Sequence, residues 1–298
     1  MKILLFGKGG QVGWELQRSL APLGEVVALG TGSTNMCGNF LDLDGLAATV
    51  RAVQADVIVN AAAYTAVDKA ESDQDACHVI NAAAPGVLAR EAARTNALLV
   101  HYSTDYVFDG SGTQPWCESD AVHPLSVYGK TKLAGEREIQ ASGCRHLIFR
   151  TSWVYAARGG NFAKTMLRLA AERDALAVVN DQLGAPTGAD LIADVTSHAI
   201  RAAQTQPALG GLYHLVASGS TSWHGYADFV ISFARRNGVA IKVAQDAISA
   251  VASDAFPTPA PRPKNSRLSI DKLQAAFGLT MPQWEDGVTR MLTEIFEK

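Results

Sequence analysis

Short apolar runs alternate with stretches of helical period along the first half of the chain. Runs of strand length occupy 2–6, 25–29, 57–62, 98–103 and 146–150. Between them, apolar residues recur at a spacing of three or four positions, which is the period of a helix. This alternation predicts parallel βαβ units, and therefore an α/β fold in which helices cover both faces of a central sheet.

The expected helices fill the intervals between these strands. One begins at Gln11, a second covers 46–53, and a long pair runs from about 67 to 94 with a break at Pro85-Gly86. Another begins near Ser126 and carries Tyr128. Proline lacks a backbone N–H and clashes with the preceding turn, so it interrupts a helix at or before its own position.

A glycine-rich turn joins the first strand to the first helix. Its pattern is Gly7-x-x-Gly10-x-x-Gly13, which differs from the common G-x-G-x-x-G spacing because position 12 is Val. Backbone N–H groups at such a strand-to-helix turn, together with the positive end of the helix, can bind a pyrophosphate. The sequence thus predicts a dinucleotide site on a Rossmann-like, doubly wound parallel sheet.

The second half is less regular, and no repeat or low-complexity linker separates it from the first. Strand-like runs at 177–179 and 212–216 are expected to return to the sheet. The remaining stretches, 153–173, 183–200 and 222–298, are expected to build a smaller lobe. We therefore predict a dinucleotide-binding domain over 1–152 with the two returning strands, interleaved with a substrate-binding lobe mainly over 153–298.

Composition narrows the class of protein. Of the 298 residues, 48% are hydrophobic and 18% charged, which excludes a disordered chain. A formal charge of −3 argues against a nucleic-acid partner. With no leader and no apolar run near ~20 residues, we expect a cytoplasmic protein without a membrane partner. The four cysteines lack metal-ligand spacing and are expected to be reduced: Cys37, Cys77, Cys117 and Cys144.

Tyr128 and Lys132 lie four residues apart on one expected helix, so they share a face. A tyrosine has a pKa of about 10 and exchanges protons poorly near neutrality. An ammonium about 4 Å away would stabilise the phenolate and lower the pKa of Tyr128 by roughly two to three units. This spacing predicts a tyrosine that acts as an acid at physiological pH.

Glycines near the start combined with a downstream Tyr-x-x-x-Lys are the paired signature of the extended short-chain dehydrogenase/reductase superfamily. Within it, the chain resembles the dTDP-4-dehydrorhamnose reductase family over nearly its whole length. The segments that carry the resemblance are ILLFGK (3–8), DVIVNAAAYTAVD (56–68), HYSTDYVF (101–108), FRTSWVY (149–155), QLGAPT (182–187) and RPKNSRL (262–268).

This resemblance implies hydride transfer from NADPH or NADH to the 4-keto group of a dTDP-4-dehydro-6-deoxysugar, a step in nucleotide-sugar and cell-surface polysaccharide synthesis. Thr104 and Tyr128 would bind the keto oxygen, Tyr128 would protonate it, and Lys132 would hold the nicotinamide ribose. For the sugar nucleotide the same match implies Asp105 and Trp153, with Arg262, Lys264, Asn265 and Ser266 for the pyrophosphate and thymine.

Cofactor contacts follow from the same resemblance. They are Gly7, Gly10, Gln11, Val12, Gly13, Gly30, Asn39, Phe40, Ala63, Tyr64, Thr65, Tyr102, Tyr128 and Lys132. The chain departs from its relatives at Gly30, where an acidic residue usually accepts the adenosine ribose hydroxyls. No carboxylate repels a 2′-phosphate there and no Arg attracts one, so both NADPH and NADH are expected to serve.

Reductases of this branch are associated with magnesium and a dimer. Glu15, Asp190 and Glu294 are the carboxylates expected to gather at a symmetric contact between two copies and bind a structural Mg²⁺. Asp190 is shorter than a glutamate, which weakens this assignment.

Two other functions stay open. A sugar-nucleotide dehydratase or epimerase would recycle a tightly bound NAD, but a dehydratase places Asp-Glu after the threonine, whereas Asp105 is followed here by Tyr106. A non-catalytic NADP-binding subunit, like the regulatory β subunit of methionine adenosyltransferase, is the third class. The intact Thr104, Tyr128 and Lys132 favour catalysis.

Overall fold

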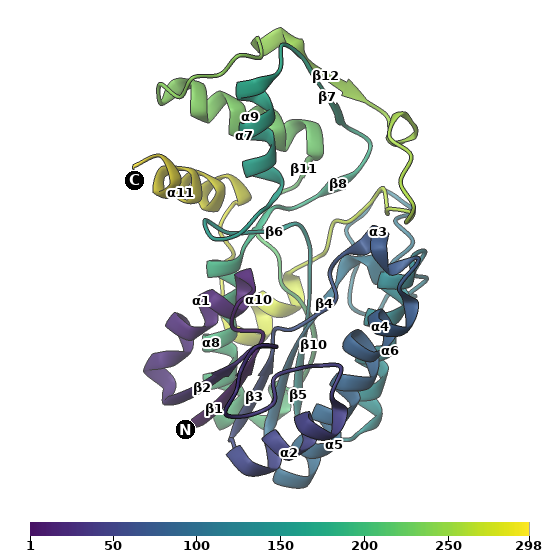
Figure 1. The fold of residues 1–298 in the computed structure, drawn as a ribbon, viewed down its shortest axis with the longest axis vertical. Coiled ribbons are helices and arrows are strands. Elements are labelled where there is room, and N and C mark those ends of the chain that lie inside the picture. Colours follow the sequence, from purple (N-terminus) through teal and green to yellow (C-terminus); the bar gives the residue numbers. More distant parts are fainter. Residues whose placement is uncertain (298) are drawn as a thin grey trace.

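A six-stranded parallel sheet forms the larger lobe of the computed structural model, which describes residues 1–297 (Figure 1). Its order is β10-β5-β4-β3-β1-β2. The strands are β1 (Lys2–Phe6), β2 (Glu25–Leu29), β3 (Val57–Asn60), β4 (Leu98–Thr104), β5 (His146–Thr151) and β10 (Gly211–His214). Chain order reverses at β1, which lies between β2 and β3, and this creates a crevice at the carboxyl edge of the sheet. The predicted doubly wound α/β fold is confirmed.

Helices cover both faces of this sheet because alternate strand residues point to opposite sides. Ile3 and Leu5 of β1 pack against one helical layer, while Leu4 and Phe6 pack against the other. The first layer contains α1 (Gln11–Leu20), α8 (Ala189–Thr205) and α10 (Asp271–Phe277). The second contains α2 (Leu43–Val53), α5 (Ala84–Thr95) and α6 (Val127–Ala141).

The break expected at Pro85-Gly86 lies just before these two residues, as a π-helical turn, and both residues belong to α5. After α3 (Val67–Ala70), α4 (Gln74–His78) runs through this turn at Val79–Ala83 directly into α5. Pro85 provides the cause, because it has no N–H to offer and its ring displaces the carbonyl of Asn81. A Cβ on Gly135 of α6 would lie 2.2 Å from that carbonyl oxygen, so α6 can pack on the turn only with glycine there.

The smaller lobe lies above the sheet in Figure 1. Its helices are α7 (Phe162–Glu172), α9 (Trp223–Arg236) and α11 (Trp284–Phe296). Three strand pairs accompany them: β6 (Val154–Tyr155) with β9 (Thr187–Gly188), β7 (Leu176–Val179) with β12 (Ile248–Val251), and β8 (Leu183–Gly184) with β11 (Thr221–Ser222). Short 3-10 turns occupy Ala21–Leu23, Asp105–Val107, Pro207–Leu209, Gln245–Ala247 and Ser253–Ala255.

Two expectations for the second half need correction. The run at 212–216 joins the sheet as β10, as predicted, but the run at 177–179 pairs with β12 in the smaller lobe instead. Helices α8 and α10 pack on the sheet and not in the smaller lobe. The two lobes are therefore more deeply interleaved than a division at residue 152 implies.

A search of residues 1–297 finds no helix that is both long enough and apolar enough to span a membrane.

Candidate active site

The turn between β1 and α1 approaches neighbouring backbone so closely that two of its glycines are obligatory. Gly7 has a φ of +87°, and a Cβ there would lie 2.6 Å from the carbonyl carbon of Ala61. A Cβ on Gly13 would lie 2.0 Å from the oxygen of Gly7. Gly10 caps α1 without a side chain, which leaves the first N–H groups of the helix open to an anion.

A cavity of about 370 Å³ begins at this turn and runs along the carboxyl edge of the sheet. Most of the residues that the resemblance assigned to the cofactor line it. They are Gly10, Gln11, Val12, Ala63, Thr65, Tyr102, Tyr128 and Lys132. Since the turn and Tyr128 both line it, the cavity can take the pyrophosphate and nicotinamide part of a dinucleotide, with the nicotinamide beside Tyr128.

Six of the assigned cofactor residues do not line this cavity: Gly7, Gly13, Gly30, Asn39, Phe40 and Tyr64. The Tyr64 hydroxyl donates to Asp73 at 3.0 Å, and its backbone is held by Asn81 of the π-helical turn, so this ring anchors the loop. Phe40 is only 4% exposed and packs edge-on against Phe6 at 5.6 Å. The Asn39 side chain accepts a hydrogen bond from the Leu41 N–H. Any contact of Asn39 or Phe40 with an adenine stays a prediction.

Gly30 follows β2, and the Lys8 side chain lies beside it. A Cβ at Gly30 would be 3.6 Å from Lys8 Cγ and 3.9 Å from Lys8 Cε, which is ordinary contact. Lys8 belongs to the turn after β1, so the absence of a basic residue in the turn after β2 did not predict a cation here. The hydrogen bond from the Lys8 N–H to the Leu29 carbonyl, which joins the two turns, could not be read from sequence spacing.

Thr104 and Tyr128 meet as expected. The Thr104 side chain hydrogen-bonds Tyr128 and also donates to the Asp105 carboxylate at 3.0 Å. The Tyr106 N–H donates to the same threonine oxygen at 3.2 Å, which fixes its position at the end of β4. Burial raises the pKa of Asp105 to about 6, although hydrogen bonds from Ser266 and Thr104 lower it.

The expected lowering of the Tyr128 pKa is wrong in direction. Burial raises the pKa of Tyr128 above its usual value, and Lys132 does not offset this. Lys132 is itself buried, and its ammonium donates to the Tyr102 carbonyl at 2.5 Å, toward β4. Burial lowers the pKa of Lys132 to about 8. Burial was expected to strengthen the attraction between the ammonium and the phenolate. It also disfavours the ammonium form of Lys132 itself.

Two further hydroxyls line the cavity and were not predicted. Ser103 and Thr151 lie at the carboxyl ends of β4 and β5, and both side-chain oxygens are buried without a hydrogen-bond partner among the described residues. A buried unpaired hydroxyl costs free energy unless a ligand satisfies it. The Ser-Thr pair at 103–104 and the Thr-Ser pair at 151–152 were the available signal.

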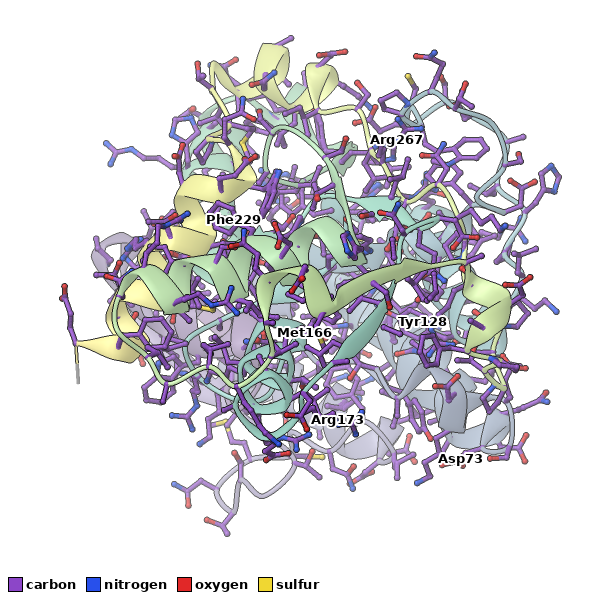
Figure 2. The ribbon with its side chains drawn as sticks, turned by 90° about the horizontal axis from the view of Figure 1, so that it is seen from above. Asp73, Tyr128, Met166, Arg173, Phe229 and Arg267 are labelled. Atoms are coloured by element: carbon purple, nitrogen blue, oxygen red, sulfur yellow. The ribbon has the colours of Figure 1, made fainter. Side chains whose placement is uncertain are left out.

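A second cavity, of about 390 Å³, lies between the lobes. It is lined by Tyr106 and Arg262 from the sheet side and by Met166 of α7 and Trp223 of α9 from the smaller lobe. Tyr106 packs edge-on against Tyr128 with ring centroids 5.5 Å apart. Figure 2, seen from above, labels Tyr128 and Met166, one residue from the lining of each cavity. Tyr128 thus lines the first cavity and contacts Tyr106, which lines the second.

The proline-rich segment 256–266 contributes Phe256, Pro257, Thr258 and Arg262 to this second cavity. Arg262 forms a two-pronged ion pair with Asp68 at 2.9 and 2.7 Å. By contrast, the Asn265 amide is 4% exposed and holds the carbonyls of Ser111 and Gln114, so it stabilises a loop. Lys264 pairs with Asp181 at 2.9 Å. Neither Lys264 nor Asn265 lines either cavity.

Trp153 occupies the left-handed region of backbone conformation, with φ +49°. Its indole stacks on Trp223 with centroids 3.6 Å apart and planes at 13°. A Cβ on Gly184 would lie 2.6 Å from Trp153 Cε2, so the indole lies directly over the glycine. The Trp223 N–H donates to Gln182, which also lines the second cavity. The structure thus holds Trp153 rigidly at the junction of the lobes.

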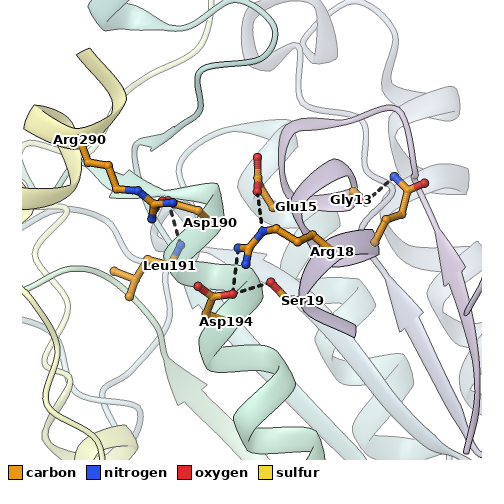
Figure 3. A network of polar contacts seen from close by, with 9 residues as sticks. Gly13, Glu15, Arg18, Ser19, Asp190, Leu191, Asp194 and Arg290 are labelled. Carbon is orange, nitrogen blue, oxygen red and sulfur yellow. Dashed lines mark hydrogen bonds and ion pairs between the residues drawn. The ribbon is translucent and has the colours of Figure 1, made fainter. Parts of the chain in front are cut away.

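The three carboxylates expected to bind magnesium lie near one another, but within one chain they do not form a metal site. Glu15, Asp190 and Glu294 line one small cavity together with Arg290. Arg290 pairs with Asp190 at 2.8 Å, and Arg18 pairs with Glu15 at 3.5 Å (Figure 3). Within residues 1–297, no group of three His, Cys, Asp or Glu side chains is arranged to hold a metal ion. Arginine already neutralises two of these carboxylates.

A glycine turn at the point where strand order reverses is how Rossmann-type oxidoreductases hold a dinucleotide. A Tyr-x-x-x-Lys pair on α6, with the lysine buried, narrows the class to short-chain dehydrogenases/reductases. A family model described as the RmlD substrate binding domain matches residues 1–296.

Two curated relatives agree with this class. The dTDP-4-dehydrorhamnose reductase of Salmonella typhimurium is 59% identical over 296 residues, covering 99% of this chain and 98% of the relative. The enzyme of the same name from Escherichia coli K12 is 58% identical with the same coverage. The chain belongs to the dTDP-4-dehydrorhamnose reductase family.

Solved structures agree at the level of the fold. A dTDP-4-dehydrorhamnose reductase from Clostridium acetobutylicum superposes with a TM-score of 0.89 at 33% identity, covering 100% of both chains. One from Bacillus anthracis, in complex with NADP, has a TM-score of 0.86 at 32% identity and covers 98% of this chain and 99% of that one.

Proposed function

We propose that this protein reduces the 4-keto group of dTDP-4-dehydro-β-L-rhamnose to give dTDP-β-L-rhamnose, with NADPH or NADH as the hydride donor. The observation that carries the proposal is the position of Tyr128, which lines the first cavity and packs on Tyr106 of the second cavity. A proton donor at this junction can reach a carbonyl that receives hydride from the first cavity.

The residues of the first cavity fit a nicotinamide dinucleotide. The start of α1 would hold the pyrophosphate, and Lys132 with the unpaired hydroxyls of Ser103 and Thr151 would hold the polar groups near the nicotinamide. When bound, the nicotinamide supplies the hydride. The family membership and the NADP complex of the Bacillus anthracis relative support this assignment.

The chain's own chemistry is proton transfer and orientation. Thr104 hydrogen-bonds Tyr128 and is held by the Tyr106 N–H, so both hydroxyls can converge on one carbonyl oxygen. Because its pKa is raised, Tyr128 is protonated at neutral pH and can donate its proton to the alkoxide that develops. Arg262 beside the second cavity would attract the pyrophosphate of the sugar nucleotide, and Trp153 would limit where the sugar can lie.

The test is NADPH oxidation by the pure protein with a panel of dTDP-4-dehydro-6-deoxysugars, with dTDP-4-dehydro-β-L-rhamnose expected to react best. Turnover of dTDP-glucose or UDP-galactose without added nicotinamide would instead identify a dehydratase or epimerase. NADPH binding without oxidation of any ketosugar, together with copurification of a partner enzyme, would identify a regulatory subunit.

A homodimer is the remaining part of the proposal. The exposed Trp14, at 46%, precedes Glu15 on α1 and would be covered in such a contact. Because Arg18 and Arg290 neutralise Glu15 and Asp190, we expect any dimer to form without magnesium.

A further inference from the structure

His101 lies fully buried on β4, between the end of β3 and the active-site lysine. It is 0% exposed, and its two ring nitrogens face different partners. Nδ1 lies 3.0 Å from the Asn60 amide nitrogen, and Nε2 lies 3.3 Å from Lys132 Nζ. Burial and the nearby Lys132 lower the pKa of His101 well below its usual value, so the ring is neutral and carries one proton.

The Asn60 amide decides which ring nitrogen carries that proton. Its oxygen accepts the Ala62 N–H at 3.0 Å, so its NH₂ group is the one turned toward His101. An NH₂ group can only donate, and Nδ1 must therefore accept. The ring proton is left on Nε2, which points at Lys132.

An Nε2–H aimed at Lys132 requires an acceptor there. An amine has a lone pair, but an ammonium has none and can only donate. With Lys132 as an amine, hydrogen bonds run in one direction from the Ala62 N–H through Asn60 and His101 to Nζ, which still donates to the Tyr102 carbonyl. With Lys132 as an ammonium, two donors face each other in a buried site, which is unfavourable.

We propose that Asn60 and His101 are positioning residues that oppose the ammonium form of Lys132 and so set the pH range in which this lysine is charged. The proposal rests on the proposed function only in taking Lys132 as part of the active site. It assigns a role in the site to a buried Asn–His pair that lines neither of these two cavities.

The other titratable groups around Lys132 act in the opposite direction. Glu136, one turn further along α6, and Cys77 of α4 both raise the pKa of Lys132. Tyr128, on the same helix, is protonated because its own pKa is raised. Burial outweighs Glu136 and Cys77 and lowers the pKa of Lys132 to about 8. The hydrogen bonds that run from Asn60 through His101 to Lys132 also disfavour the ammonium form, so they act on the pKa of Lys132 in the same direction as burial.

The first test uses the unmodified protein. In two-bond proton–nitrogen spectra of histidine-labelled protein, we expect His101 to carry its proton on Nε2, with Nδ1 unprotonated, throughout pH 6 to 8. A proton on Nδ1, or a charged ring, would overturn the proposal. H101F identifies the signal, and the measurement needs no substrate, so it decides the proposal even if the enzymatic assignment fails.

The second test reverses the direction of the hydrogen bonds between residue 60, His101 and Lys132. In N60D, a carboxylate would accept both the Ala62 N–H and an Nδ1–H, so Nε2 would become an acceptor for the ammonium of Lys132. We expect the lysine Cε signal, identified with K132R, and the alkaline limb of kcat/KM to titrate at a pH higher by about one unit or more.

The matched control is the double variant N60D/H101F. It keeps the new carboxylate but removes the imidazole whose two nitrogens connect residue 60 to Lys132 by hydrogen bonds. We expect most of the rise to be lost in this variant. An equal rise with and without the imidazole, or no rise in N60D that remains folded by circular dichroism, would show that His101 has only a structural role.

Discussion

Coenzyme choice can be tested at Lys8 and Gly30, which face each other across the turns that follow β1 and β2. The Lys8 side chain lies within 3.9 Å of the position that a Gly30 Cβ would take. An acidic side chain there would repel a 2′-phosphate, whereas Lys8 can attract one. We therefore expect both coenzymes to be used, with NADPH favoured modestly.

The size of the preference follows from the exposure of Lys8. A unit charge pair about 4 Å apart in water is worth about 1 kcal/mol, and a doubly charged phosphate about twice that. At about 1.4 kcal/mol per factor of ten, Lys8 should favour NADPH by roughly five- to thirtyfold. The preference should shrink as salt screens the exposed pair.

The assay compares kcat/KM for NADPH and NADH in K8M, which keeps the length of the side chain, and in K8R, which keeps its charge. K8M should lose about tenfold with NADPH and little with NADH, whereas K8R should change little. Gly30 has an ordinary backbone conformation with room for a side chain, so G30D should fold and should weaken NADPH selectively.

Two results would refute this reasoning. One is a K8M protein whose coenzyme ratio equals that of the unmodified protein at low salt. The other is an unmodified protein that favours one coenzyme by more than about a hundredfold, because an exposed pair cannot supply ~3 kcal/mol.

Four further predictions concern the active site and assembly. Y128F should lower kcat by roughly two to four orders of magnitude with NADPH binding kept, and near-normal turnover would mean that another acid acts. Because the pKa of Lys132 is about 8 when folded and about 10.4 when unfolded, the unfolded chain binds more protons between these values. The free energy of unfolding should therefore rise from pH 8 to 10, by at most about 3 kcal/mol, relative to K132M in denaturant titrations. W223A should raise KM for the sugar nucleotide, leave KM for NADPH unchanged and remove the near-ultraviolet dichroism of the Trp153–Trp223 stack. W14A is the control. A KM for the sugar nucleotide in W223A equal to that of the unmodified protein would argue against a role of Trp223 in positioning Trp153. The sedimentation coefficient should be identical with and without EDTA. Dissociation of a dimer by EDTA would instead support a magnesium ion bound at the contact between the two copies.

Local features of this protein were determined by the sequence alone. The run 2–6, the glycines at 7 and 13 and the apolar period of the following helix specify a strand, a turn and a helix, because each depends on neighbours within a few residues. The same holds for Tyr128 and Lys132, whose spacing places them on one helix face in any tertiary context.

Partners distant in the chain were decided only by the tertiary structure. A strand-like run at 177–179 has the same local pattern whether it joins the central sheet or pairs with β12, and only the packing of the smaller lobe selects β12. Asn265 looks like a ligand residue in sequence, yet its amide is used by the carbonyls of Ser111 and Gln114.

The pKa values of Lys132 and Tyr128 were also decided only by the tertiary structure. Sequence spacing predicted that a cation beside a phenol would make the tyrosine more acidic, whereas the structure surrounds both groups with protein and turns the lysine toward Tyr102 and His101. Desolvation depends on every atom packed around a group, and those atoms come here from α4, α6 and β4. Only the folded arrangement could determine the sign of these two pKa shifts.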